Sequence, residues 1–162
     1  MELWDAYDAK FQQITNTFLR RGETIPDGFY HLVCEVIVRH YDGTYLLMQR
    51  DPHKRFGGMW EATAGGSALQ GESPLACAIR ELREETGIIA QKLTELGRMV
   101  NHTTHTIYTD FLCVTNWNKK SVILQQGETV AYKWISGNEL INMPEGELAA
   151  NRTLNFLKEL EW

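Results

Sequence analysis

The sequence predicts a mixed α/β (α+β) fold that forms one globular domain. The chain has 162 residues, of which 43% are hydrophobic and 23% are charged, so it can bury one core but not two comfortable ones. Strand-type runs recur between residues 29 and 135, and two further segments have the apolar spacing of a helix. Strands combined with two substantial helices indicate a mixed sheet sandwiched between helices.

The first two strands are expected on either side of a tight turn. Residues 29–39 (FYHLVCEVIVR) and 44–50 (TYLLMQR) flank Asp42-Gly43, a dipeptide that is favoured in hairpin turns. Two antiparallel strands are therefore predicted. Further strand-type runs occupy residues 93–101, 104–115 and 128–135.

A helix is predicted between Ser73-Pro74 and Gly87. Proline suits the first turn of a helix, and glycine is common just past its end. One face of this helix is expected to pack on the core. That face consists of Leu75, Ile79, Leu82 and Thr86.

Different structures are predicted for the two ends of the chain. From Pro144 onward, helical spacing predicts an amphipathic helix that is built on Thr153, Phe156, Leu157 and Leu160. Residues 1–28 are expected to form an N-terminal arm or hairpin packed on the main domain, which comprises residues 29–162.

Three carboxylates form a stripe on the predicted helix. Glu81, Glu84 and Glu85 are spaced i, i+3 and i+4, so they lie on one side of the helix and repel one another. A divalent cation over the stripe would offset this repulsion, because hard cations prefer oxygen ligands. The alternative interpretation is a solvated acidic surface, which is the usual fate of glutamate-rich helix faces.

Composition argues against several classes of partner. The formal net charge is −5, which does not suit binding to the backbone of a nucleic acid, and no apolar stretch is long enough to span a bilayer. The N-terminal residues carry acids where a signal peptide would need an apolar core. Cys34, Cys77 and Cys113 are few and widely spaced, which favours a reducing compartment. We therefore expect a cytoplasmic protein without a membrane or nucleic-acid partner.

The stretch from residue 66 to residue 88, GSALQGESPLACAIRELREETGI, resembles the signature of the Nudix hydrolases. All fixed positions of that signature are present without insertion or deletion. They are Gly66, Glu72, Arg80, Glu81, Leu82, Glu84, Glu85, Gly87 and Ile88. The flanking Gly58, Trp60 and Gly65 also agree with the family.

This resemblance implies a Nudix-type fold and a metal-dependent hydrolase. The expected reaction cleaves the diphosphate linkage of a nucleoside diphosphate joined to another group, or of a related organic diphosphate, with Mg²⁺ or Mn²⁺. The family pattern places metal ligands at Glu81, Glu84 and Glu85, with the backbone carbonyl of Gly65 or Gly66 as a further ligand. Arg80 would orient these acids through a charge-assisted hydrogen bond.

Glu72 has two interpretations that the sequence leaves open. It is either an acid that favours the start of the helix or a partner of Arg80.

Several positions outside the signature are candidates for the site. Arg50 ends an apolar strand and is an anchored candidate for binding substrate phosphate. His53, Lys54 and Arg55, in the loop DPHKRFGG, could do the same, but a solvated loop is the preferred interpretation. Glu128 precedes a strand at a place where some relatives have a general base near the metal, so it is a hypothesis for that role.

Two rival functions are weighed against hydrolysis. The N-terminal portion resembles the branch of the superfamily that includes isopentenyl diphosphate isomerase, but residues 61–65 (EATAG) lack the cysteine and histidine of those isomerases. The second rival is a non-catalytic diphosphate-binding module, against which the retained glutamates argue.

The absence of proline between residues 91 and 105 disfavours the ADP-ribose class of substrate. A homodimer is left open.

Overall fold

The computed structural model describes residues 1–150, 152 and 154–160. The strands are β1 (Leu3–Tyr7), β2 (Gln13–Arg20), β3 (His31–His40), β4 (Thr44–Arg50), β5 (Trp60–Glu61), β6 (Thr63–Ser67), β7 (Thr94–Asn101), β8 (Thr106–Thr115) and β9 (Thr129–Ser136), and the helices are α1 (Pro74–Thr86), α2 (Gly137–Ile141) and α3 (Leu154–Glu159). The strands predicted from residues 93, 104 and 128 are confirmed as β7, β8 and β9.

Within the described part of the chain, β3 to β9 form one seven-stranded mixed sheet. β3 runs parallel to β8 and antiparallel to β6. β7 pairs antiparallel with β8, and β4 pairs antiparallel with both β5 and β9. The predicted mixed fold is therefore confirmed.

The predicted turn at Asp42-Gly43 joins β3 to β4, but the two strands soon separate. Gly43 N–H donates to His40 O at 2.9 Å, and Arg39 faces Tyr45 in antiparallel register. Beyond this pair β4 turns away toward β5 and β9. The prediction of a turn between two antiparallel strands is confirmed, and the pairing is short because β6 lies beside β3 from Val33 to Ile37.

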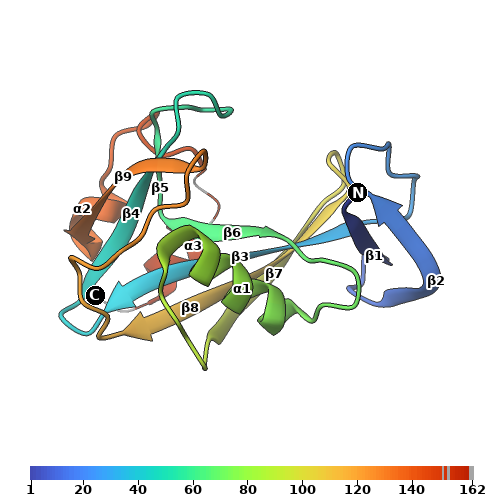
Figure 1. Cartoon of the computed structure of the whole chain (residues 1–162), viewed down its shortest axis with the longest axis horizontal. Coiled ribbons are helices and arrows are strands. Elements are labelled where there is room, and N and C mark those ends of the chain that lie inside the picture. Colours follow the sequence, from blue (N-terminus) through green and yellow to red (C-terminus); the bar gives the residue numbers. More distant parts are fainter. Residues whose placement is uncertain (151, 153, 161–162) are drawn as a thin grey trace.

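Helices cover both faces of the sheet. α1 buries Cys77, Ala78 and Leu82 in the core on one face, whereas α2 and α3 bury Leu140 and Leu157 on the other. Figure 1 shows the β1–β2 hairpin at one end of the long axis and β4, β9 and α2 at the opposite end. The sandwich predicted from the sequence is thus present.

The ends of α1 follow the sequence signals. The Ser73 hydroxyl accepts a hydrogen bond from Ala76 N–H at 3.1 Å, which satisfies one of the free amides at the helix start. Gly87 ends the helix with a φ of 76°, a left-handed conformation that favours glycine.

The core face of α1 differs in part from the prediction. Leu82 and Thr86 are fully buried as expected, but Leu75 is 41% exposed. Cys77 and Ala78 take the core positions instead. The buried stripe of the helix therefore runs through these two small residues rather than through Leu75.

The C-terminal helix is confirmed in part. α3 is short, and its Leu157 is fully buried. Thr153, which was assigned to the same helix face, lies outside the described residues.

The N-terminal residues form a two-stranded antiparallel sheet of their own. Leu3 pairs with Arg20 and Trp4 with Leu19, and the buried side chains of Trp4, Ala6 and Leu19 make a small separate core. A bridge between Tyr7 and Tyr30 connects this hairpin to β3. The domain boundary expected after residue 28 stays a prediction.

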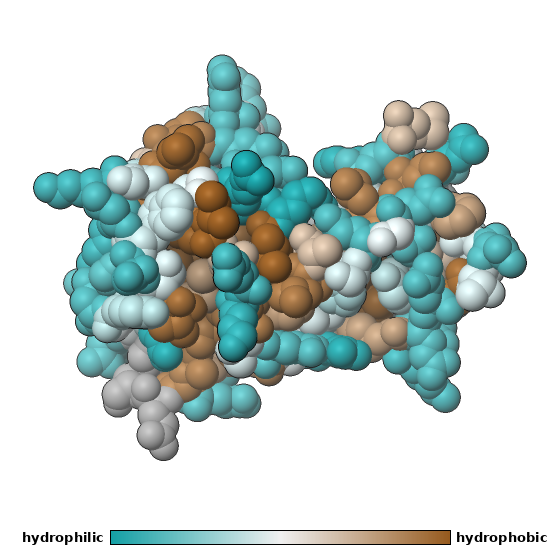
Figure 2. Space-filling view, turned by 60° about the horizontal axis from the view of Figure 1, so that its bottom comes forward, coloured by the Kyte–Doolittle hydropathy of each residue, from teal (hydrophilic) through white to brown (hydrophobic). Residues whose placement is uncertain are grey.

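The surface carries scattered hydrophobic side chains. Figure 2 shows hydrophobic residues exposed at several places on one face, separated by hydrophilic ones. None of the helices in the described part of the chain has the length and hydrophobicity needed to span a bilayer.

Candidate active site

The acidic stripe of α1 lies against strand β6, and two glycines of β6 make this approach possible. A Cβ atom at Gly66 would come within 2.6 Å of Glu81 Oε1, and one at Gly65 would come within 2.2 Å of Cys34 O on β3. Any side chain at either position would therefore collide with the carboxylate or with the neighbouring strand. Gly66 therefore lets Glu81 sit directly on the backbone of β6, and Gly65 lets β6 pair closely with β3.

Arg80 connects four acceptors at the start of the site. Its Nε and Nη2 donate to the two oxygens of Glu72 at 2.7 and 2.9 Å, and Nη1 donates to Glu81 at 2.6 Å and to Glu84 at 3.4 Å. Nη2 also donates to Ser67 O at 3.1 Å. Arg80 thus makes the charge-assisted hydrogen bonds that were expected of it.

Glu72 is a partner of Arg80 rather than an acid within the first turn of the helix. Burial alone would raise the pKa of Glu72, but the hydrogen bonds from Arg80 and from Leu69 N–H at 2.9 Å outweigh it, so the pKa is lowered. The ionised form of Glu72 is therefore favoured.

Glu85 is the acid that the protein leaves least compensated. Its side chain is buried, with 7% exposure, and Gly65 N–H donates to its Oε2 at 3.3 Å. Burial, together with the negative charges of Glu81 and Glu128, raises its pKa to about 8. Burial also raises the pKa of Glu81, although Arg80 offsets part of that effect. A cation placed here would relieve this unfavourable charge.

These acids open into one polar cavity of about 330 Å³. It is lined by Glu2, Arg21, Lys54, Gly65, Gly66, Ser67, Leu69, Arg80, Glu81, Glu84, Glu85, Gln125 and Glu128. Segments that are far apart in the sequence therefore meet at this cavity, namely the N-terminal hairpin, the loop after β4, β6, α1 and the loop before β9.

Glu128 and Lys54 face each other in this cavity. The Lys54 ammonium donates to Glu128 Oε2, and Asp51 N–H donates to Glu128 O at 2.9 Å. The structure thus brings Glu128 to the acids of α1, as its hypothesis requires. The interpretation of Lys54 as a solvated loop residue is incomplete, because its side chain lines the cavity.

Arg50 does not line the acidic cavity. Its guanidinium forms an ion pair with Glu61, and its Nε donates to Arg55 O at 2.7 Å. It lines a separate cavity of about 240 Å³, together with Glu35 and Thr63. The substrate contact expected of Arg50 stays a prediction.

Three residues of the cavity gave no signal in the sequence. Glu2 and Arg21 come from the N-terminal hairpin, and Gln125 comes from the loop before β9. Their positions depend on how distant segments dock, and no local pattern reports that.

The donor set suits a hard divalent cation. Glu81, Glu84 and Glu85 offer carboxylate oxygens beside the backbone of Gly66, whose carbonyl also accepts a weak hydrogen bond from Cys77 Sγ at 3.5 Å. Among the residues that the structure describes, no three His, Cys, Asp or Glu side chains already stand together as a metal-holding group. Mg²⁺ needs only one or two carboxylates when phosphate oxygens complete its shell, so the residues present fit such an ion.

Comparison with protein families finds a NUDIX domain over residues 30–157. An uncharacterised Nudix hydrolase of Listeria innocua is 29% identical over 164 residues, which cover 99% of this chain and 96% of that protein. Another, from Listeria monocytogenes, is 36% identical over 90 residues, and this match covers 55% of the chain and only 53% of that relative.

A solved structure shares the fold over the whole chain. The crystal structure of a protein from Deinococcus radiodurans has a TM-score of 0.76 at 17% sequence identity and covers 98% of both chains. At this identity the likeness establishes the fold alone.

Proposed function

This chain belongs to the Nudix hydrolase family, and we propose that it cleaves the diphosphate linkage of a nucleoside diphosphate joined to another group, or of a related organic diphosphate, with Mg²⁺ or Mn²⁺. The observation that carries this proposal is the gathering of Glu81, Glu84 and Glu85 in one polar cavity with too few positive charges to balance them. The substrate would be a small molecule that is derived from a nucleotide, and the protein would act on it in the cytoplasm.

The three acids of α1 would hold the metal, with the carbonyl of Gly66 as a further ligand. When bound, such an ion neutralises phosphate charge and lowers the pKa of a bound water. Glu84 is our first choice for the indispensable ligand, because its side chain is 45% exposed and only weakly held by Arg80. It can therefore turn toward an ion without breaking a strong contact.

Arg80 acts by positioning the acids. Its guanidinium donates to Glu72 on one side and to Glu81 on the other, so it fixes the direction of the Glu81 carboxylate. Glu72, whose pKa is lowered, anchors this arginine in its ionised form. Loss of either partner would loosen the ligand set.

Glu128 is the proposed general base. Its carboxylate lines the cavity and is held by Lys54, so it can take a proton from a water that attacks the diphosphate. We propose that Lys54 moves from Glu128 to a phosphate oxygen of the substrate, which leaves Glu128 free to accept that proton. Arg50 keeps its proposed role in binding the substrate, at the neighbouring cavity.

One experiment tests the reaction class. Purified protein is incubated with a panel of nucleoside diphosphate derivatives and organic diphosphates, with Mg²⁺, with Mn²⁺ or with a chelator, and products are identified by mass. We expect cleavage of the diphosphate linkage between the two phosphorus atoms when either metal is present, and no cleavage with the chelator. Isomerised products without hydrolysis would favour the isomerase branch instead, and tight binding without any product would favour the binding module.

A further inference from the structure

The N-terminal hairpin forms one wall of the acidic cavity. Glu2 and Arg21 both line it, although they precede the residues that match the NUDIX domain, which begin at residue 30. Membership of the family therefore assigns these two side chains no role. Their position has to be explained from this chain alone.

The hairpin is fixed to the loop that leads into α1. Gln70 N–H donates to Leu3 O at 2.9 Å, and Gly71 N–H donates to Asp5 Oδ2 at 2.8 Å. Asp5 is only 5% exposed, so this contact is sheltered from water. These hydrogen bonds join the hairpin that carries Arg21 to the loop that leads into the acidic helix.

Positive charge is scarce in the cavity, and most of it is already engaged. The lining carries five carboxylates, Glu2, Glu81, Glu84, Glu85 and Glu128, against Arg21, Lys54 and Arg80. Arg80 is committed to Glu72, Glu81 and Ser67 O, and Lys54 is paired with Glu128. Arg21 is the least engaged of the three.

Glu2 orients the Arg21 side chain but occupies only part of its hydrogen-bonding capacity. Its Nη1 lies 3.2 Å from Glu2 Oε2, and its side chain is 69% exposed. The other oxygen of Glu2 accepts a hydrogen bond from Trp4 Nε1 at 2.7 Å, which holds Glu2 in place. Within the described residues, the remaining donors of the Arg21 guanidinium have no protein partner, so they are available to a phosphate, which the planar guanidinium suits.

The character of the lining indicates which group would meet Arg21. Leu69 is the single apolar side chain among the lining residues, so this cavity offers little apolar surface to a base or a hydrocarbon. A substrate group at this end would have to be charged or strongly polar.

We propose that Arg21 is a positioning residue that binds a phosphate of the substrate beyond the scissile diphosphate. The inference rests on the proposed function, and it narrows the substrate to compounds with three or more linked phosphates. The hairpin then contributes to specificity, while the acids of α1 carry out the cleavage.

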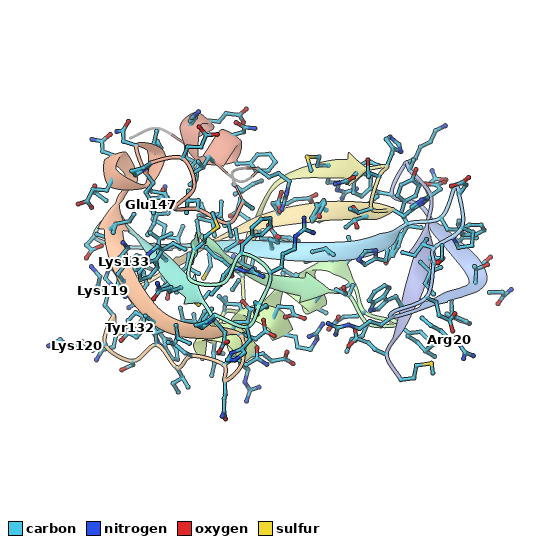
Figure 3. All side chains as sticks on the ribbon, turned by 90° about the horizontal axis from the view of Figure 1, so that it is seen from above. Arg20, Lys119, Lys120, Tyr132, Lys133 and Glu147 are labelled. Atoms are coloured by element: carbon cyan, nitrogen blue, oxygen red, sulfur yellow. The ribbon has the colours of Figure 1, made fainter. Side chains whose placement is uncertain are left out.

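The test compares two simple ligands and three variants. Inorganic triphosphate and inorganic pyrophosphate are titrated into the protein by calorimetry with Mg²⁺ present, which needs no turnover. Arg21→Ala removes the guanidinium and Arg21→Lys keeps only its charge. Arg20→Ala is the matched control, because Arg20 is the adjacent arginine on the same hairpin. It lines a different groove, beside Phe18 and Phe29. Figure 3 shows Arg20 at the hairpin end of the molecule, away from Lys119, Lys120 and Lys133.

We expect Arg21→Ala to weaken triphosphate binding about tenfold and pyrophosphate binding less than twofold. Arg21→Lys should recover part of the loss, and Arg20→Ala should change neither ligand. With a hydrolysed substrate of three or more phosphates, Arg21→Ala should raise KM and leave kcat nearly constant.

Equal losses for the two ligands, an equal effect of Arg20→Ala, or no preference of the unaltered protein for triphosphate would overturn the proposal. These outcomes are separate from those of the hydrolysis panel. Retained triphosphate selectivity without any hydrolysis would support Arg21 and refute the proposed function.

Discussion

Two arginines, Arg80 and Arg152, each gather carboxylates, but they do so in opposite ways. Arg152 donates to both oxygens of Asp110 and to Glu35, and it lies 4.1 Å from the centre of the Tyr108 ring. Glu35 alternates along β3 with the residues that face α1, so this cluster lies on the face of the sheet opposite to the acidic helix.

The difference lies in charge balance and burial. Burial raises the pKa values of Glu35 and Asp110, and Arg152 offsets part of this effect for each. At the other cluster Arg80 serves Glu72, Glu81 and Glu84, while Glu85, with a pKa of about 8, lacks an ion pair with any described residue. Arg152 thus contacts both acids of its cluster and holds the fold together, whereas Arg80 leaves Glu85 without a cation, so that cluster is suited to a cation from outside.

The largest effect is expected at the acidic cluster of α1. Glu84→Gln should lower kcat/KM for a diphosphate substrate about a thousandfold, because a lost metal ligand removes several kcal/mol of charge stabilisation in the transition state. The free energy of unfolding should hardly change, since the Glu84 side chain is 45% exposed.

Steady-state hydrolysis with Mg²⁺, alongside urea unfolding, measures both quantities. Glu95→Gln is the matched control, because Glu95 is also an exposed glutamate paired with an arginine. Nearly normal turnover by Glu84→Gln would contradict the role of the stripe in catalysis.

Loss of the cation from the Arg152 cluster should lower the stability of the fold. Arg152→Met leaves Glu35 and Asp110 without their cation, and we expect a loss of about 3–5 kcal/mol in the free energy of unfolding. Arg98→Met is the control, because Arg98 likewise combines an ion pair with an aromatic contact, to Glu95 and Phe11, but is 51% exposed. Its loss should stay below about 1 kcal/mol.

Urea unfolding of the two arginine variants measures both losses in the free energy of unfolding. Neutralising both acids as well, with Glu35→Gln and Asp110→Asn, should restore part of the stability that Arg152→Met loses. Similar losses in Arg152→Met and Arg98→Met would show that the buried cluster is no more structural than a surface pair.

A smaller effect is expected from pH in the metal-free protein. The folded-state pKa of Glu85, about 8, is above the usual value of 4.5, so the native state retains a proton that the unfolded chain releases. Between these two pH values the contribution of Glu85 to stability should therefore fall as pH rises.

The free energy of unfolding is measured in chelator at intervals from pH 5 to pH 9. In Glu85→Gln the decline should be shallower, because the amide does not ionise. A decline of the same slope in this variant would contradict the assignment to Glu85. Saturating Mg²⁺ should also reduce the decline, since a cation favours the ionised carboxylate.

Much of the acidic helix could be predicted because its signals are local. Ser73, Pro74 and Gly87 set its ends through backbone geometry, and the spacing of Glu81, Glu84 and Glu85 puts them on one side. The turn at Asp42-Gly43 was predictable for the same reason. The partners of β4 could not be predicted, because strand pairing depends on which distant segment packs best at the open edge of the strand.

The sequence by itself therefore determined a mixed fold, an acidic stripe beside two glycines and membership of a diphosphate-cleaving family. Only the tertiary structure decided that Glu85 is buried while Glu84 stays exposed, that Arg50 turns to Glu61, and that Arg21 reaches the acidic cavity. Helix periodicity and turn geometry act over a few residues, and a sequence reports them directly. Burial and charge balance arise when remote segments dock, so they exist only in the folded chain.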